Sequence, residues 1–407
     1  MDTELVAGRR IAIVSHSFPP HGGGGITSLN ANLFQALKRK GIRVRVFTFG
    51  DHGLQRSEEE DIIRNGSPKA LIRILRILNR IFFRLAERAT FAYQVLDILE
   101  SGVGSFRINR QLSAFAPDVV ILPDHNAPGF FLRKKSIGGS WILISHHNPM
   151  RFLDNPLIGV HSRKDASWAL RLENRVLSKI DKVICPSAYM RHIFAATYAF
   201  SGPVSVIPNL VDADLLTSLA EKDIRTNIGL SPDAPVVYIP SAGARLKGAR
   251  FVFEIIRRLA GMTEREVGFY LSGAVDGELR YECMFAPKNA KIYMPGKVAY
   301  RENVGLVKSC SYAISPTLIE NFSMSLLEAC FLGLPVVTFD VGGNAEIIRD
   351  GENGFLVPYL DVEMLIERSG RLLLDAQERR RMADNSIALM RSAFDSEKTI
   401  GQYLQIF

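Results

Sequence analysis

Short apolar runs alternate with longer amphipathic stretches along almost the whole chain. The first run, Arg10–Ser15, is followed by a glycine-rich loop and by a helical pattern that ends near Gly41. A second apolar run, Ile42–Phe47, comes next. Strand, helix and strand in this order predict a β-α-β unit, which is the opening of a parallel, doubly wound sheet.

The same rhythm predicts two further series of strands separated by helices. In the first half of the chain they are Val119–Leu122, Trp141–Ser145, Lys182–Pro186 and Val204–Ile207. In the second half they are Val236–Pro240, Gly268–Ser272, Lys291–Met294, Tyr312–Ser315 and Pro335–Phe339. A looser polar segment, 212–233, lies between the two series, and we interpret it as the domain junction.

The length of 407 residues exceeds what one hydrophobic core usually supports. Two consecutive α/β series therefore predict two Rossmann-like domains, residues 1–212 and 213–390. Ligands of such sheets bind at the carboxyl ends of the strands, so a cleft between two such edges is the expected active site.

Composition narrows the class of protein. Hydrophobic residues make up 47% of the chain and charged residues 23%, which is typical of globular proteins. The N-terminal apolar run is too short for a signal peptide, and no apolar stretch is long enough to span a membrane. The cysteines are far apart, which disfavours a disulfide framework or a zinc site and favours a reducing, cytoplasmic environment. They are Cys185, Cys283, Cys310 and Cys330.

The most informative motif contains two glutamates, Glu320 and Glu328, around the predicted start of a helix. Ser323 is expected to be the N-cap, so the N–H groups of Met324 and Ser325 would form an anion site with the helix dipole. Glu328, one turn further on, could accept hydrogen bonds from two hydroxyls, as a ribose requires. Taken alone, such a pair is better explained as two exposed glutamates with solvent partners.

A second motif follows the strand that begins the second domain. Arg245 and Lys247 lie in a glycine-containing strand-to-helix turn that ends at Gly248. Two cations in such a turn can neutralise a diphosphate, with lysine as a point charge and arginine as a fork. A solvated turn is the alternative for this motif alone.

The glycine-rich loop after the first strand contains Gly22, Gly23, Gly24 and Gly25, which let the backbone approach a ligand closely. The spacing departs from GxGxxG, and no acidic residue ends the second strand. A dinucleotide-binding site is therefore disfavoured.

Polar residues also follow two strands of the first half. Asp124 and His125 come after one strand, and His146 and His147 after another. Such residues face the expected cleft, although a lone histidine is more often structural. No third ligand has metal-binding spacing and no Asp-x-Asp pair is present, so we expect no metal site.

Together these segments resemble the GT-B fold, family 4 (retaining) glycosyltransferases, also called glycosyl transferases group 1. The resemblance covers nearly the whole chain in the correct order. Its motifs are FPPHGGGG, HHNP, DKVICPSAYM, VIPNLVDADLL, ARLKG, PGKV, SPTLIENFSMSLLEACFLGLPVV, FDVGGNAEII and NGFLVP.

The resemblance implies a role for individual residues. Glu328 would bind the donor ribose, Glu320 the donor sugar, and Arg245 and Lys247 the diphosphate. His147 would lie near the sugar hydroxyls as a catalytic residue together with Glu320 and Lys247. The remaining donor-site positions are Val298, Phe322, Ser323, Met324 and Ser325, and the acceptor and phosphate loop comprises Gly22–Gly25 with His125.

Two positions depart from the usual pattern of this family. Arg245 is closer to Lys247 than in most members, which leaves the arginine assignment less secure than that of the lysine. Ser323 replaces a common glycine, but a capping serine can serve the same turn.

The resemblance also implies the reaction. Members retain anomeric configuration and need neither metal nor cofactor, and the donor is a nucleoside-diphosphate sugar, with UDP favoured over GDP or ADP. The segment 391–407 is expected to form a helix that crosses back to the N-terminal domain.

Basic and apolar residues are concentrated in the segment 69–86. The net charge is +8, and Arg73, Arg76, Arg80 and Arg84 recur at helical spacing among leucines and isoleucines. The pattern predicts an amphipathic helix that lies on an anionic membrane surface, at the inner face of the cytoplasmic membrane. A lipid-linked or cell-envelope glycan acceptor would follow. An ordinary domain helix with solvated arginines is the alternative.

Three other functions are weighed against a glycosyltransferase. An epimerase or a sugar phosphorylase could use the same two-domain cleft. A non-catalytic sugar- or nucleotide-binding module is disfavoured by the intact set of Glu320, Glu328 and Lys247. Nucleic-acid binding is not expected, because the basic stretch lacks interleaved stacking aromatics.

Overall fold

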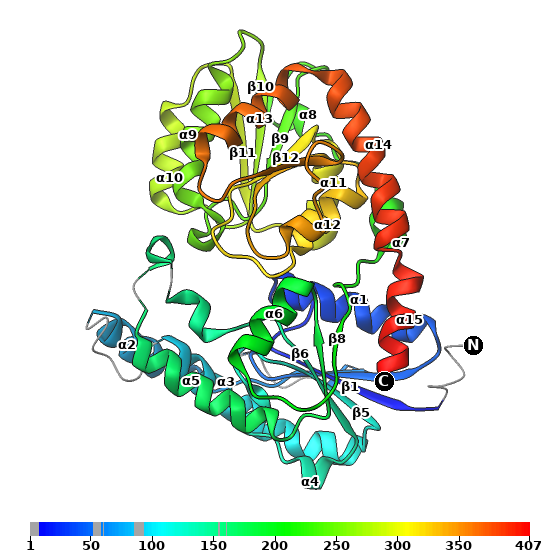
Figure 1. Ribbon diagram of the computed structural model, residues 1–407. Coiled ribbons are helices and arrows are strands. Elements are labelled where there is room, and N and C mark those ends of the chain that lie inside the picture. The colour runs from blue at the N-terminus through cyan, green and yellow to red at the C-terminus, as the bar shows by residue number, and fades with distance from the viewer. Residues whose placement is uncertain (1–7, 52–57, 60, 85–92, 154, 160) are drawn as a thin grey trace. The chain divides into compact units, whose positions relative to one another are not determined.

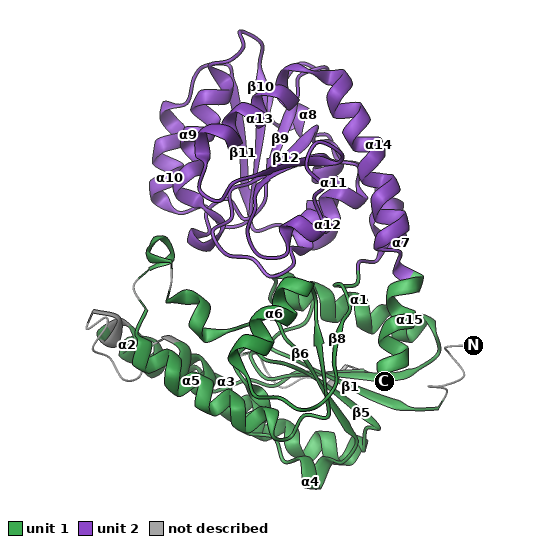
Figure 2. Ribbon diagram, viewed as in Figure 1, with its two compact units in different colours: residues 1–210, 397–407 green, residues 211–396 purple. Residues whose placement is uncertain are grey.

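The computed structural model describes residues 8–51, 58–59, 61–84, 93–153, 155–159 and 161–407. The chain divides into two compact units, residues 1–210 with 397–407 (unit 1) and residues 211–396 (unit 2) (Figure 1 and Figure 2). The first boundary between the units follows residue 210, two residues before the predicted boundary at residue 212. The second falls after the helix α14 (Ala376–Ala393), which continues past the predicted boundary at residue 390.

Unit 1 is built on an eight-stranded sheet with the order β3-β4-β2-β1-β5-β6-β7-β8. Neighbouring strands are parallel except β3 and β4, a short antiparallel pair that the sequence did not predict. The strands are β1 (Arg10–Ser15), β2 (Arg43–Thr48), β3 (Glu58–Glu59), β4 (Ile62–Ile63), β5 (Val119–Pro123), β6 (Ser140–Ile144), β7 (Lys182–Cys185) and β8 (Val204–Val206).

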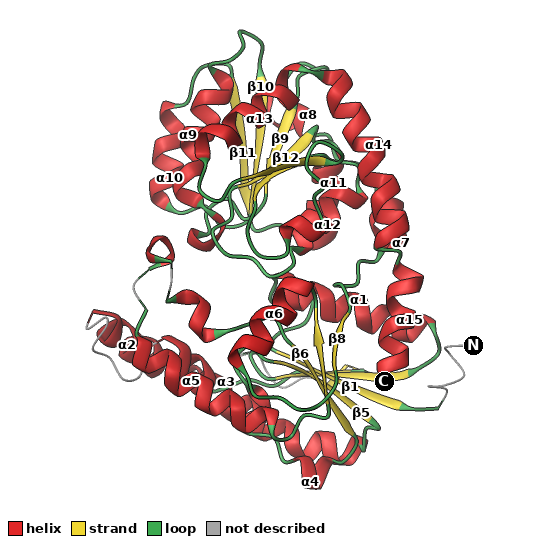
Figure 3. Cartoon of the chain, viewed as in Figure 1, coloured by secondary structure: helices red, strands yellow, loops and turns green. Residues whose placement is uncertain are grey.

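Helices cover both faces of this sheet (Figure 3). In β1, Ile11 and Ile13 enter one core cluster, while Ala12 and Val14 enter the cluster on the opposite face. A strand buried on both faces explains the continuous apolar run in the sequence. The helices of unit 1 are α1 (Gly25–Arg39), α2 (Lys69–Arg84), α3 (Tyr93–Phe115), α4 (Lys134–Ile137), α5 (Arg163–Leu177), α6 (Ala188–Thr197) and α15 (Ser396–Ile406), with 3₁₀ turns at Pro128–Phe130, Pro149–Phe152 and Pro156–Ile158.

The helix α15 completes the core of unit 1 from the far end of the chain. Its apolar residues join the cluster that covers β1 and α1. The Lys182 ammonium donates to the Ile406 carbonyl at 2.6 Å, and Lys40 pairs with Glu397. Ile400, Tyr403 and Leu404 of this helix are buried, and so is Phe407 directly after it.

Unit 2 contains a six-stranded parallel sheet with the order β11-β10-β9-β12-β13-β14. The strands are β9 (Val236–Ile239), β10 (Val267–Ser272), β11 (Ala290–Gly296), β12 (Tyr312–Ser315), β13 (Val336–Phe339) and β14 (Gly354–Val357). The helices are α7 (Ala213–Ser218), α8 (Ile224–Ile228), α9 (Ala249–Ala260), α10 (Gly277–Glu282), α11 (Tyr300–Lys308), α12 (Met324–Phe331), α13 (Val362–Leu374) and α14, with 3₁₀ turns at Arg245–Lys247, Cys283–Phe285 and Asn344–Glu346.

The prediction of a loose junction over 212–233 is wrong. This segment contains α7 and α8, which pack within unit 2 and bury Leu216 and Ile224 completely. Each helix is five or six residues long and fully buries one large apolar side chain. Such short helices leave no periodic pattern in the sequence.

Both sheets reverse their strand order at one place, between β1 and β5 in unit 1 and between β9 and β12 in unit 2. Loops leaving the carboxyl ends of two such strands diverge and form a crevice, where ligands of α/β sheets bind. These loops carry most of the candidate residues.

Candidate active site

The switch point of unit 2 joins a cation and a carboxylate that are far apart in sequence. Lys247, in the turn after β9, forms an ion pair with Glu320, in the loop after β12. The second oxygen of Glu320 accepts a hydrogen bond from the backbone N–H of Asn321 at 3.1 Å. The Glu320 side chain is only 12% exposed, so the carboxylate is held in a defined position.

Backbone contacts between the two loops explain this juxtaposition. Gly248 has φ +79°, and a Cβ atom there would lie 2.0 Å from the Pro316 carbonyl oxygen. The N–H of Leu318 also donates to the Leu246 carbonyl at 3.0 Å. Only glycine permits so close an approach, which accounts for its place after Lys247.

The prediction that Ser323 caps a helix is confirmed. Its hydroxyl accepts from the Leu326 N–H at 3.4 Å at the start of α12, and lies 3.1 Å from the Ser325 hydroxyl. The capped first turn holds the positive end of the α12 dipole next to the loop that carries Glu320.

Glu328 lies on the second turn of α12 and is half-buried. The Tyr300 hydroxyl, at the start of α11, donates to Glu328 Oε1 at 3.0 Å. Burial raises the pKa of Glu328 to about 7, and the hydrogen bond from Tyr300 opposes this shift only in part. Tyr300 was missed by the sequence analysis, because a tyrosine at the start of a helix has no distinctive spacing to a glutamate 28 residues later.

The other predicted donor-site residues of unit 2 differ in exposure. Arg245 is exposed, and Val298 is half-buried against the core of unit 2. Phe322 and Met324 are buried in that core, so their side chains support the loop from inside.

The switch point of unit 1 gathers three imidazoles from three different strand ends. His16 follows β1, His125 follows β5 and His147 follows β6. The ring centroids of His16 and His125 are 6.4 Å apart, and those of His125 and His147 are 5.6 Å apart, each pair edge to face. Gly50 leaves room for this row, since a Cβ there would lie 2.4 Å from His16 Nε2.

All three imidazoles favour the neutral form. Burial lowers the pKa of His16, lowers that of His125 to about 4 and lowers that of His147 to about 3. A neutral imidazole offers one donor and one acceptor nitrogen, which suits hydroxyl groups better than phosphates. His16 was not predicted as a site residue, although it follows the first strand as the other two histidines follow theirs.

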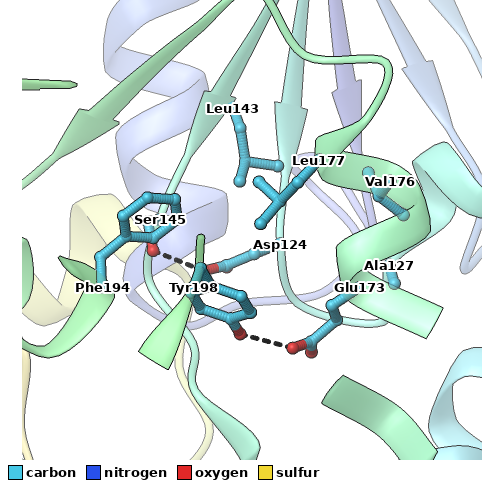
Figure 4. A pocket seen from close by; sticks show the side chains of 9 residues that line it. All are labelled: Asp124, Ala127, Leu143, Ser145, Glu173, Val176, Leu177, Phe194 and Tyr198. Atoms are coloured by element: carbon cyan, nitrogen blue, oxygen red, sulfur yellow. Dashed lines mark hydrogen bonds between the residues drawn. The ribbon is translucent and has the colours of Figure 1, made fainter. Parts of the chain in front are cut away.

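A buried carboxyl group fixes the loop that carries His147. Asp124 Oδ2 accepts from the Ser145 hydroxyl at 3.0 Å and from the His147 N–H at 2.8 Å. Asp124 also lines a small cavity with Glu173, which accepts from the Tyr198 hydroxyl at 2.5 Å (Figure 4). Burial raises the pKa of Asp124 to about 6 and that of Glu173 to about 8.

The glycine-rich loop precedes α1. Gly24 is the N-cap of α1 with φ +100°, and a Cβ on Gly22 would lie 2.1 Å from the Ser17 hydroxyl. Gly22–Gly25 are exposed. The buried Arg64, also missed, donates to the carbonyls of Phe18 and Pro19 at 2.8 and 2.7 Å and so anchors the start of the loop.

Comparison with known proteins decides the family. The family described as Glycosyl transferases group 1 matches residues 221–388, and the family described as Glycosyltransferase Family 4 matches residues 23–215. The chain belongs to the group 1 glycosyltransferases. The two matches fall almost entirely within unit 2 and unit 1, respectively.

Relatives of this group 1 glycosyltransferase are distant in sequence. The MMP α-(1→4)-mannosyltransferase of Mycolicibacterium hassiacum is 26% identical over 58% of this chain and 56% of its own length. An uncharacterized glycosyltransferase of Methanocaldococcus jannaschii is 26% identical over 62% of this chain and 64% of its own length. The matched region thus spans less than two thirds of either relative.

Solved structures bear out the GT-B fold of this group 1 glycosyltransferase. Sucrose-phosphate synthase from Thermosynechococcus elongatus superimposes with a TM-score of 0.74 at 17% identity, covering 98% of each chain. Anabaena HepE in complex with UDP and glucose gives a TM-score of 0.68 at 17% identity, covering 98% of this chain and 99% of HepE.

The described residues contain no candidate metal centre. Within these ranges, no three or more His, Cys, Asp or Glu side chains are arranged so that they could hold a metal ion. Within the same ranges, no helix is long and apolar enough to cross a bilayer.

Proposed function

We propose that this chain is a retaining glycosyltransferase that moves a sugar from a UDP-sugar to a hydroxyl of a glycan acceptor. The observation that carries the proposal is the arrangement of Lys247, Glu320 and Glu328 around the capped start of α12, at the switch point of unit 2. A cation, a helix N-terminus and two carboxylates match the parts of a nucleoside-diphosphate sugar. The diphosphate needs positive charge, while the ribose and the sugar need hydrogen-bond acceptors.

In the proposed donor complex, Lys247, Arg245 and the amides of Met324 and Ser325 bind the diphosphate. Glu328 accepts hydrogen bonds from the ribose hydroxyls and Val298 contacts the base. Because Glu328 now accepts from Tyr300 at one oxygen, the ribose would share this carboxylate with the tyrosine or displace it. UDP is favoured because the HepE structure, similar in fold, is described as a complex with UDP and glucose.

The proposed reaction breaks the bond between the anomeric carbon and the diphosphate oxygen. The acceptor hydroxyl attacks from the same face, and its proton passes to the departing diphosphate oxygen, so the configuration is retained. Lys247 stabilises the negative charge on the leaving group, and Glu320 stabilises the positive charge at the sugar. No step requires a metal or a cofactor, so activity should persist in EDTA.

Unit 1 is proposed to hold the acceptor and the hydroxyls of the transferred sugar. His147 is the proposed catalytic residue of this unit, with His125 and the loop Gly22–Gly25 beside it. Neutral imidazoles in a row can donate to and accept from sugar hydroxyls without attracting a competing anion. This fits a hydroxyl acceptor rather than a phosphate.

The first experiment is a thermal scan of the purified protein with UDP-, GDP- and ADP-sugars. One class, expected to be UDP, should raise the melting temperature, and Glu328→Ala and Lys247→Ala should abolish the shift. Lys222→Ala is the matched control, because it breaks an exposed ion pair of the same unit with Glu302. If no nucleotide sugar stabilises the wild type, the donor site is wrong and a binding module or another GT-B enzyme becomes the better description.

We further propose that α2 rests on an anionic membrane at the cytoplasmic face, which would give access to a lipid-linked or cell-envelope acceptor for polysaccharide synthesis. Residues 85–86 of the predicted segment lie outside the described residues. Ile72 and Leu75 are buried, whereas Ile74, Ile77 and Ile81 are about half exposed. Isoleucines at this spacing share a helical face, and the exposed Arg73 and Arg76 flank them.

Vesicle flotation tests this surface. The wild type should bind phosphatidylglycerol vesicles and not phosphatidylcholine vesicles. Ile77→Glu removes apolar contact with the bilayer, and Arg73→Glu replaces a positive charge with a negative one. Each change should weaken the free energy of membrane binding by more than about 1 kcal/mol, so binding should fall at least about tenfold. Met284→Glu, at an exposed methionine of unit 2, is the control. Unchanged binding by Ile77→Glu would refute the proposal.

A further inference from the structure

The first turn of α3 reaches the row of histidines through one side chain. Gln94 is 5% exposed, and its Oε1 lies 3.0 Å from Nε2 of His147. No motif in the sequence pointed to Gln94, which precedes His147 by 53 residues. The contact is partly buried between α3 and the loop after β6, with Gln94 on its buried side.

The position of Gln94 is itself fixed. The carboxylate of Asp165, in the first turn of α5, accepts from the backbone N–H groups of Gln94 and Val95 at 2.8 and 3.1 Å. Asp165 is 2% exposed. A buried carboxylate on the first amides of a helix holds that helix end in place. The Gln94 side chain therefore starts from an anchored backbone.

The imidazole of His147 is confined on its other sides by rings. Its centroid is 5.6 Å from that of His125 and 5.5 Å from that of Phe152. These neighbours restrict the orientation of the His147 ring, but neither of them determines whether Nδ1 or Nε2 carries the proton. A neutral imidazole exists as two tautomers, and the hydrogen bond at one nitrogen selects between them.

We infer that Gln94 is a positioning residue that keeps His147 in the Nε2–H tautomer and leaves Nδ1 as the acceptor for a sugar or acceptor hydroxyl. The amide oxygen of Gln94 accepts the Nε2 proton, so the lone pair of the ring is at Nδ1. The role of Nδ1 as an acceptor for a sugar or acceptor hydroxyl rests on the proposed function. The tautomer itself does not depend on that function.

The consequence for catalysis is one of orientation. If the wrong nitrogen carries the proton, the ring offers a donor where the hydroxyl needs an acceptor. Misplaced hydrogen-bonding groups in an active site reduce the rate by roughly 10- to 100-fold. The wrong tautomer of His147 should therefore lower kcat of sugar transfer, because the donor site of unit 2 keeps all its contacts.

The test combines a spectroscopic and a kinetic measurement on the full chain. The protein is labelled with ¹⁵N-histidine, the His147 signals are assigned by His147→Asn, and the tautomer is read from the two ring-nitrogen shifts. The variants are Gln94→Leu, which removes the acceptor, and Gln94→Glu, which keeps an acceptor oxygen. Gln111→Leu is the matched control, because Gln111 lies on the same helix and accepts from Asn65 at 2.9 Å.

We expect a single Nε2–H tautomer in the wild type and in Gln94→Glu, and a mixture in Gln94→Leu. In Gln94→Leu, kcat should fall roughly 10- to 100-fold, while stabilisation by UDP alone, which is proposed to contact only unit 2, stays unchanged. Gln94→Glu should recover part of the loss, and Gln111→Leu should resemble the wild type.

Three results would overturn the inference: an Nδ1–H tautomer in the wild type, no change of tautomer in Gln94→Leu, or an equal loss of kcat in Gln111→Leu. Failure of the proposed function has a different signature. In that case no UDP-sugar stabilises or is consumed by the wild type, while the tautomer measurement still reports on Gln94.

Discussion

The switch points of the two units occupy equivalent places in similar sheets, yet their chemistry differs. In unit 2 the loops bring Lys247 and Glu320 together as an ion pair, and Glu328 lies on the second turn of the helix α12 that follows. In unit 1 the corresponding loops bring together imidazoles whose pKa values are lowered by burial. One sheet architecture thus supports a charged site and a neutral site, because the side chains that meet come from loops and helices outside the sheet.

The two sites are also held together differently. The loops of unit 2 contact each other through their own backbones, as Gly248 against Pro316 shows. In unit 1, Asp124 connects the loops after β5 and β6, and His147 also depends on a buried side chain of the helix α3, Gln94. The site of unit 2 therefore depends mainly on loop sequence, whereas the site of unit 1 also depends on the packing of a helix beside it.

The largest effect should come from removing one charge of the unit 2 site. Glu320→Gln keeps the size of the side chain but loses the carboxylate that pairs with Lys247, so kcat should fall roughly 100- to 1,000-fold. Initial rates with a saturating UDP-sugar measure it. Glu302→Gln, which loses an exposed ion pair with Lys222, should change kcat less than about twofold. Comparable losses in both variants would mean that Glu320 has no special role.

A smaller effect is expected from a core substitution that destabilises one unit and leaves the other unchanged. Tyr403 is fully buried in the core of unit 1, so Tyr403→Ala should destabilise that unit by about 3 kcal/mol. Hydrogen exchange followed by mass spectrometry should show faster exchange in β1 and α1 and unchanged exchange in β9 and β12. Gln405→Ala, at an exposed position of the same helix, is the control. Equal acceleration in both units would show that they do not unfold separately.

The smallest effect concerns pH and the buried Glu173 of unit 1. Burial raises the pKa of Glu173 to about 8 in the folded state, against 4.5 ordinarily. Between these values the folded protein binds a proton that the unfolded chain lacks. The stability that the protonated carboxyl contributes is therefore complete below 4.5 and is lost as the pH rises through about 8.

Glutamine mimics the protonated carboxyl and can still accept from Tyr198. Glu173→Gln should therefore exceed the wild type in stability by on the order of 2 kcal/mol at about pH 9, and by little at about pH 5. Urea unfolding at both pH values measures the difference. Glu264→Gln, at an exposed position, is expected to show none. A Glu173→Gln variant less stable than the wild type at high pH would contradict the prediction.

How much the sequence could predict depends on whether a feature is local. β1 and β12 begin and end as expected, and Ser323 caps its helix, because apolar runs and caps depend on a few adjacent residues. Tyr300 and Gln94 could not be found, since their partners are brought near only by the fold. The short helices α7 and α8 were not predicted, because a single buried side chain in each leaves no periodic pattern of apolar residues in the sequence.

The helix α15 also has a consequence for how the chain acquires its structure during synthesis. The core of unit 1 requires Ile400, Tyr403, Leu404 and Phe407, and the ribosome makes these residues only after it has made all of Val211–Ser396. At about 5–20 residues per second, this delay lasts roughly 10–40 s. During that time unit 2 can fold, while unit 1 exposes the apolar surface that α15 will cover. The first domain to be translated is therefore the last to be completed.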